Sequence, residues 1–154
     1  WMHYLSVGAN YTVIDATVEV PEELQASLEF HDIGQEERDM EGQPESLLNI
    51  NVNCDIEEWG TAAGYYYNLR GDMLKSGAAV GDTGAIPNIY ETERPTANLT
   101  FSQQLNDNLK LSLKARNLTD PTLREVYRVP DDKDKVRREW REGVSYSVSL
   151  SGTW

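Results

Sequence analysis

Hydrophobic and polar residues alternate strictly in several stretches of the chain, most clearly at its C-terminal end. Val144, Tyr146, Val148, Leu150 and Trp154 fall on one face there, and serines and a threonine fall on the other. A period of two residues predicts a β-strand with one apolar and one polar face. The final stretch is therefore expected to be such a strand, ending on an aromatic residue.

The same alternation recurs earlier, in residues 5–13, 48–56, 59–70, 97–102 and 109–116. No long amphipathic helical pattern accompanies these stretches, so the sequence predicts an all-β fold. With the C-terminal stretch this makes six strands of about ten residues each, which would pair as an antiparallel meander.

The connections between the expected strands alternate in length. Short turns are expected at residues 57–58 and 106–108, whereas residues 20–46, 71–96 and 118–143 form three long connections. Loops of this length are uncommon in compact soluble domains. Short turns at one end and long loops at the other are typical of an outer-membrane β-barrel, in which the long loops are extracellular.

The polar face also favours a barrel, because it carries amides and cations suited to a hydrated lumen. The residues expected to face the lumen or a plug are Arg70, Lys110, Lys114, Arg116, Asn49, Asn51 and Asn53. Cations facing lipid at the membrane midplane would cost about 2–4 kcal/mol each. Trp59, Tyr65, Tyr67 and Trp154 fall near strand ends, where an aromatic girdle is expected.

Composition narrows the possibilities further. The 154 residues carry a formal charge of −12, which argues against nucleic acid as a partner. No apolar run approaches the roughly 20 residues of a transmembrane helix, and no secretory signal is recognisable at the N-terminus. The single cysteine, Cys54, excludes an internal disulfide and falls on the expected lipid face, where it acts as a small hydrophobic residue.

Five segments, in order, resemble the C-terminal barrel region of TonB-dependent outer-membrane receptors. They are 42–50 (GQPESLLNI), 67–71 (YNLRG), 86–91 (IPNIYE), 113–120 (LKARNLTD) and 143–154, the closing strand. The motif residues that carry the resemblance are Asn68, Gly71, Asn117, Leu118 and Asp120, and those of the terminal assembly signal are Tyr146, Val148, Leu150 and Trp154. Cys54 and Trp154 depart from the family, which more often has an aromatic residue and phenylalanine at these places.

The resemblance implies a barrel of about 22 strands closed by a plug domain. Residues 1–154 would be its last six strands, and the plug, the TonB-contacting segment and the earlier strands would be absent from this chain. The implied function is energised uptake of a scarce substrate, of the siderophore, cobalamin or oligosaccharide class, across the bacterial outer membrane. The implied partners are outer-membrane lipid and lipopolysaccharide, the plug, the TonB complex, the barrel assembly machinery and the substrate.

The charged connections offer little chemistry of their own. Residues 19–45 contain ten carboxylates against one arginine, which indicates a solvated outer loop, and His31 has no second histidine at ligand spacing. Residues 118–143 mix both signs of charge, as salt-bridged loops do. Neither a catalytic residue nor a cofactor or metal site is expected, so the chain is not expected to be an enzyme.

Two other interpretations fit the alternation. A soluble, secreted β-sandwich that binds carbohydrate would bury the same apolar faces in a closed core. A small self-standing barrel or adhesin would close by association of several six-stranded copies.

Overall fold

The computed structural model describes residues 4–82, 84–129 and 132–153 and consists mainly of antiparallel β-strands. The elements are β1 (Leu5–Val13), β2 (Thr17–Glu19), α1 (Glu22–Glu29), β3 (Glu37–Asp39), β4 (Ser46–Ile56), the 3-10 helix η2 (Glu57–Trp59), β5 (Thr61–Arg70), β6 (Met73–Ser76), β7 (Ala79–Gly81), β8 (Gly84–Ile86), β9 (Asn88–Glu91), β10 (Arg94–Asn106), β11 (Leu109–Arg116), β12 (Leu123–Arg128), β13 (Lys135–Trp140) and β14 (Ser145–Gly152). The predicted all-β antiparallel class is confirmed.

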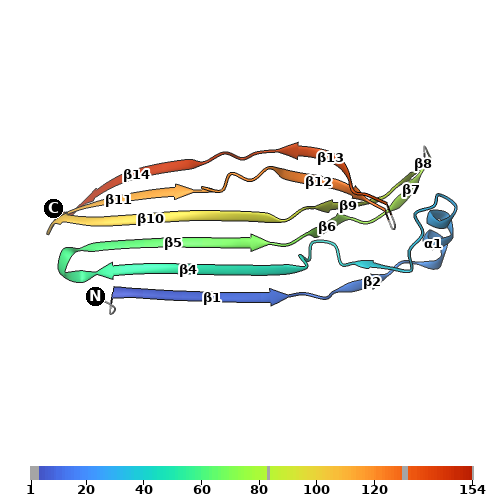
Figure 1. Ribbon diagram of the computed structural model, residues 1–154. Helices are drawn as coiled ribbons and strands as arrows, with labels where there is room; N and C mark the ends of the chain where they lie inside the picture. The colour runs from blue at the N-terminus through green and yellow to red at the C-terminus, as the bar shows by residue number, and fades with distance from the viewer. Residues whose placement is uncertain (1–3, 83, 130–131, 154) are drawn as a thin grey trace.

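The largest sheet has six strands in the order β1-β4-β5-β10-β11-β14. Its strands lie side by side along the length of the molecule, and the chain enters and leaves at the same end (Figure 1). Tight connections join β4 to β5 through η2 and β10 to β11 through residues 107–108. Within the described residues β1 and β14 each pair with one neighbour, so the sheet is open at both edges.

The two faces of this sheet differ sharply, as strict alternation requires. On one face the register aligns Val7 with Val52, Val52 with Tyr65, and Leu113 with Val148. Many large apolar side chains of this face are exposed: Leu5, Val7, Tyr11, Val13, Tyr65, Leu99, Leu113, Tyr146, Val148 and Leu150. The opposite face is lined by amides, hydroxyls and cations.

The three long connections, expected to be loops, are largely folded. They continue the strands beyond the six-stranded sheet and form a four-stranded sheet, in the order β13-β12-β9-β6, and two two-stranded sheets, β2-β3 and β7-β8. We call residues 14–45, 71–93 and 117–144 together the head region. It lies at the end opposite the chain termini and includes α1 (Figure 1).

The buried core of the described residues lies mainly in the head region. One cluster comprises Val20, Leu28, Ile33 and Ala78, and a second comprises Leu74, Tyr90 and Val126. In the six-stranded sheet, by contrast, a single described hydrophobic residue, Ala97, is buried. The head region therefore encloses its own core, whereas the six-stranded sheet leaves its apolar face open.

Candidate functional site

A row of asparagines crosses the polar face over three strands. The register places Asn49 of β4 between Asn10 of β1 and Asn68 of β5. The Asn49 amide donates to Asn10 Oδ1 at 2.8 Å, and the Asn68 amide donates to Asn49 Oδ1. These side chains are directly opposite one another, so each hydrogen bond links neighbouring strands. Two of the residues selected from the sequence, Asn49 and Asn68, are thus brought together.

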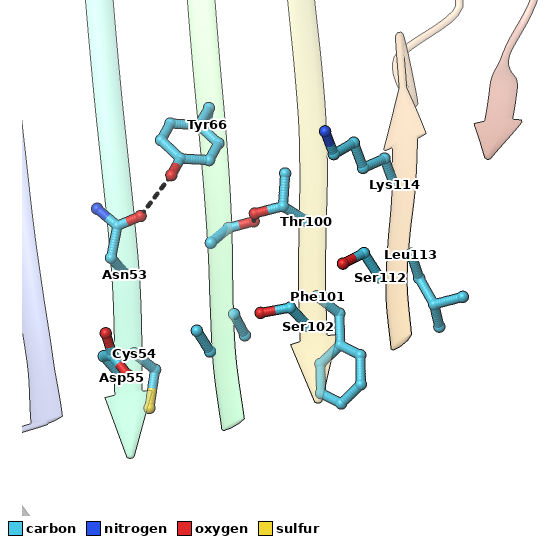
Figure 2. Close-up of a pocket in the computed structure, with 13 residues that line it drawn as sticks. Asn53, Cys54, Asp55, Tyr66, Thr100, Phe101, Ser102, Ser112, Leu113 and Lys114 are labelled. Carbon is cyan, nitrogen blue, oxygen red and sulfur yellow. Dashed lines mark hydrogen bonds between the residues drawn. The ribbon is translucent and has the colours of Figure 1, made fainter. Parts of the chain in front are cut away.

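Closer to the turn end, Tyr66 lies over Gly64 on the same polar face. Its hydroxyl donates to Asn53 Oδ1 at 2.7 Å across the β4–β5 pair (Figure 2). A Cβ added at Gly64 would come within 2.8 Å of the Tyr66 hydroxyl and 2.9 Å of Thr100 Oγ1. The absence of a side chain at Gly64 leaves room beside a hollow that residues of β4, β5, β10 and β11 line.

A second close approach involves Asn51, which lies between Asn49 and Asn53 along the polar face of β4. Its side chain lies against Gly8 of β1, where an added Cβ would be 2.6 Å from Asn51 Oδ1. A glycine facing an amide across the pair leaves that amide room on the polar face.

Three cations, Lys110, Lys114 and Arg116, project from the polar face of β11. They stand opposite serines of β14, namely Ser151, Ser147 and Ser145. All three are exposed, and Lys114 extends over β10 in Figure 2. Within the described residues none of the three forms an ion pair. Their expected contact with a plug or an anionic ligand stays a prediction.

Arg70, the fourth expected lumen cation, has partners within the chain. Its Nη2 atom donates to Glu91 Oε1 at 2.9 Å and to the Thr92 carbonyl at 3.2 Å. Arg70 and Glu91 are both largely shielded from solvent. Arg70 therefore ties the end of β5 to the head region, and a role toward a plug stays a prediction.

Asn117 and Asp120 form a compact turn where β11 leaves the six-stranded sheet. Both have positive φ angles, 57° for Asn117 and 37° for Asp120, a region that asparagine and aspartate tolerate better than most residues. The Asn117 amide donates to the Gly143 carbonyl at 2.8 Å, and Asp120 Oδ1 accepts from the Gly143 amide at 3.0 Å. The backbone amide of Leu118 donates to the Ala97 carbonyl at 2.8 Å.

These bonds give the 117–120 motif a structural role in this chain. It joins the end of β11 to Gly143, just before β14, and to β10 through Ala97. The turn thus fixes where the six-stranded sheet ends and the head region begins.

Gly71 lies where β5 continues toward β6. An added Cβ would be 2.7 Å from Ser46 Oγ, and the Gly71 amide donates to the Ser46 carbonyl at 2.8 Å. Close approach to the start of β4 requires glycine here. Beyond Gly71 and Asp72 the chain continues from β5 into β6 (Figure 1).

The residues assigned to a terminal assembly signal lie on the edge strand β14. Tyr146, Val148 and Leu150 are 74%, 72% and 62% exposed, on the apolar face of the sheet. Trp154, the last member of this set, lies outside the described residues. A role in assembly stays a prediction.

The head region contains a buried carboxylate that sequence reasoning missed. Glu125 of β12 is fully buried and contacts three cations: Lys75 of β6 and Arg138 of β13 at Oε1, and Arg137 of β13 at Oε2. The hydrogen bond from Lys75 is the main reason that the pKa of Glu125 lies below its usual value; burial opposes it, and Arg137 adds to it.

A second polar network surrounds Arg128, three residues further along β12. Its guanidinium contacts Asp72 at 2.6 Å and Asp134 at 2.9 Å, and stacks over the Tyr90 ring, 4.2 Å from the centroid. The Tyr90 hydroxyl donates to Asp39 Oδ2 at 2.7 Å. Burial, followed by this bond, raises the pKa of Tyr90. The network connects all three parts of the head region.

The sequence of β12 carries no clear signal for this arrangement. Residues 123–128 read LREVYR and do not alternate between apolar and polar residues, although in a strand Leu123 and Glu125 fall on one face. Both are buried, because β12 is an inner strand of the four-stranded sheet. The burial of a glutamate here depends on cations from β6 and β13, which lie outside this segment of the sequence.

The side chains described above form hydrogen bonds and ion pairs. Among the described residues no group of three or more histidine, cysteine, aspartate or glutamate side chains could hold a metal ion. Across the same residues, no helix is long and apolar enough to cross a membrane.

Comparisons with protein-family models, with curated proteins and with solved structures find no match for this chain.

Proposed function

We propose that this chain contributes six strands to the wall of a bacterial outer-membrane barrel of the TonB-dependent receptor kind. The parent function is uptake of a scarce substrate, of the siderophore, cobalamin or oligosaccharide class, driven through TonB. The observation that carries the proposal is the continuous apolar face of the six-stranded sheet, whose large side chains are exposed.

The physical argument starts from the size of that face. It extends over six strands, and Val7, Val13 and Tyr146 on its outer strands are each more than 60% exposed. Soluble monomers rarely expose contiguous apolar patches of more than a few hundred Å². Lipid covers such a face without a second protein layer, and the opposite face then turns to water.

The open edges support the same proposal. Unpaired strand edges are costly in lipid, because their backbone N–H and C=O groups find no water. We therefore infer that β1 and β14 pair with further strands of a larger barrel. Residues on the polar face, Asn51, Lys110, Lys114 and Arg116 among them, then line the lumen and face the plug.

In this proposal the head region lies on the extracellular side. Folded loops there contact lipopolysaccharide and substrate, while the exposed side chains of β14 are recognised by the barrel assembly machinery. Coupling to TonB belongs to the plug and to parts of the receptor other than these strands. The chain itself has a structural and binding role and is not proposed to be an enzyme.

Purification with and without detergent tests the proposal. A membrane wall predicts aggregation without detergent and a dispersed, β-rich species in detergent micelles. A soluble carbohydrate-binding sandwich predicts instead a monodisperse monomer that melts cooperatively in buffer, and that outcome would overturn the proposal. A closed ring of several copies, resistant to dissociation in detergent, would favour the self-standing barrel.

A further inference from the structure

The buried carboxylate of Glu125 is surrounded by more positive charge than it can neutralise. Lys75, Arg137 and Arg138 all contact its carboxylate. Lys75 and Arg138 share Oε1, so their cationic groups are neighbours. One negative charge against three positive charges leaves a surplus of two in this cluster, although the chain as a whole is strongly acidic.

The three cations also keep hydrogen-bond donors that Glu125 does not use. An arginine has five N–H donors and a lysine has three, and each of these side chains uses a small part of its capacity on Glu125. Their side chains remain 44%, 41% and 58% exposed for Lys75, Arg137 and Arg138, so the unused donors reach the surface.

Other carboxylates near the cluster are engaged elsewhere. Glu139 pairs with Arg124, and Glu91 pairs with Arg70. In the part of the chain that the structure describes, no carboxylate besides Glu125 pairs with Lys75, Arg137 or Arg138. The surplus charge is therefore left for a ligand.

We propose that Lys75, Arg137 and Arg138 form a binding site for a phosphate or sulfate group. The fully buried Glu125 holds the three cations together before the ligand binds, and Arg138 is further held by stacking on Trp140, with its guanidinium carbon 4.6 Å from the ring centroid. Guanidinium groups bind tetrahedral oxyanions through paired, charge-assisted hydrogen bonds. An oxyanion bound here also reduces the repulsion among the three cations.

This site is independent of the barrel proposal, because every residue in it lies in the head region. The first experiment titrates the 154-residue chain, in zwitterionic detergent, with inorganic phosphate and follows the arginine side-chain resonances by NMR. Saturable binding with shifts at Arg137 and Arg138 is expected. If phosphate binds nowhere in a saturable way, and phosphate-bearing lipid also fails, the proposal is wrong.

The variant Arg137→Gln/Arg138→Gln removes two cations and leaves Lys75 to neutralise Glu125. It is expected to weaken phosphate binding at least about tenfold. The matched control, Arg124→Gln/Arg141→Gln, removes the same charge from β12 and from the residue after β13. It is expected to change binding less than about twofold. Equal weakening in both variants would mean that net charge alone attracts the anion and would overturn the site.

If the double variant loses the fold of the head region, Arg138→Gln alone decides, since this side chain is the most exposed of the three. A few-fold loss of phosphate affinity supports the site, and unchanged affinity contradicts it.

Micelles doped with phosphatidic acid, compared with micelles doped with diacylglycerol, identify the source of the oxyanion. Stronger binding to phosphatidic acid that the Arg137→Gln/Arg138→Gln variant abolishes indicates a phosphate at a lipid surface. Binding of inorganic phosphate without a preference for phosphatidic acid indicates a free anion or a small phosphorylated ligand.

Discussion

The six-stranded sheet and the head region are both built of antiparallel strands, yet they place their apolar side chains in opposite environments. In the head region, Leu28, Leu74 and Leu123 are fully or almost fully buried. In the sheet, side chains of the same chemical kind, such as Val7 and Leu150, are more than half exposed. Strand pairing runs through both regions, so hydrogen bonding does not account for the difference.

What separates the two regions is where each finds an apolar environment. The head region makes its own, by folding α1 and eight short strands around small cores and by pairing its buried charges. Among the described residues nothing apolar covers the exposed face of the sheet, and on our proposal lipid covers it. The two regions should therefore respond differently to mutation, to pH and to detergent.

The largest effect is expected from a charge on the apolar face. Val52 lies near the middle of β4, between Val7 and Tyr65. We expect Val52→Arg to destabilise the sheet in lipid by about 2–4 kcal/mol, as an arginine does near the membrane midplane. The measurement is the urea midpoint of the chain refolded in phosphatidylcholine vesicles.

Asn51→Arg is the matched control, one residue away and on the polar face. Its effect should stay within about 0.5 kcal/mol, because a hydrated surface accepts a charge. If the two variants lose the same stability, the two faces do not differ in environment and the comparison between them fails.

The head region should depend strongly on its buried carboxylate. Glu125→Gln removes the charge that holds Lys75, Arg137 and Arg138, and we expect a loss of about 3 kcal/mol in local stability. The three cations left behind remain partly hydrated, so the loss of local stability should not exceed about 3 kcal/mol. Amide hydrogen exchange of β12 and β9 measures it.

Glu139→Gln provides the control, since Glu139 forms an exposed ion pair with Arg124 at 3.4 Å. Exposed pairs contribute less than about 1 kcal/mol. Comparable losses of stability in the two glutamine variants would show that the buried Glu125 stabilises the head region no more than an exposed ion pair does.

Acid should loosen the head region before it affects the sheet. The pKa of Glu125 is lower in the folded chain than its ordinary value of 4.5, mainly because of Lys75. Its contribution is therefore complete above that ordinary value and is lost as the pH falls through the lower, folded value. Hydrogen exchange of β12 against β4, from about pH 7 to about pH 2, should show earlier loss of protection in β12, and Glu125→Gln should reduce that difference.

A moderate effect is expected at the turn between the two regions. Asn117 has a φ of 57° and bonds to the Gly143 carbonyl. Asn117→Ala should cost about 1–2 kcal/mol, because alanine disfavours this backbone region and loses the bond. Asn117→Gly relieves the backbone and should cost less than alanine; an equal or greater cost would locate the effect in the side chain alone. Denaturant titration of both variants makes the comparison.

The smallest effect is expected from the polar face. Tyr66→Phe removes the 2.7 Å hydrogen bond to Asn53 and leaves the ring in place. A cost of about 1 kcal/mol is expected, because water can replace the lost partner on a hydrated face. A loss of several kcal/mol would mean that Asn53 is left without water, contrary to a hydrated lumen.

The alternation of apolar and polar residues predicted the long strands of the six-stranded sheet, because this pattern depends only on residues that are neighbours in the sequence. Residues 5–13 and 109–116 appear in the structure as β1 and β11 with those bounds, because period-two patterning fixes which face each side chain takes. The asparagines on one face of β4 were likewise visible in the sequence, although their bonds to Asn10 and Asn68 needed the register between strands.

The head region was harder to predict because its strands are short and its partners are distant. The segment between Gly71 and Thr96 forms β6, β7, β8 and β9, each of three or four residues, too short for a clear period. The burial of Glu125 depends on Lys75, fifty residues away, and on a pair of arginines in β13. Charge-rich segments of this kind resemble solvated loops until tertiary pairing is known.

The most direct test of the central claim uses the single cysteine of the chain. Cys54 lies on the apolar face of β4, and Asn53 beside it lies on the polar face. A spin label is attached to Cys54, or to Asn53→Cys in a Cys54→Ser background, and the protein is refolded in lipid vesicles. If lipid covers the apolar face, the label at 54 collides mainly with oxygen and the label at 53 mainly with a water-soluble nickel complex. Equal access of the nickel complex to both labels would show that water covers both faces and would contradict the account.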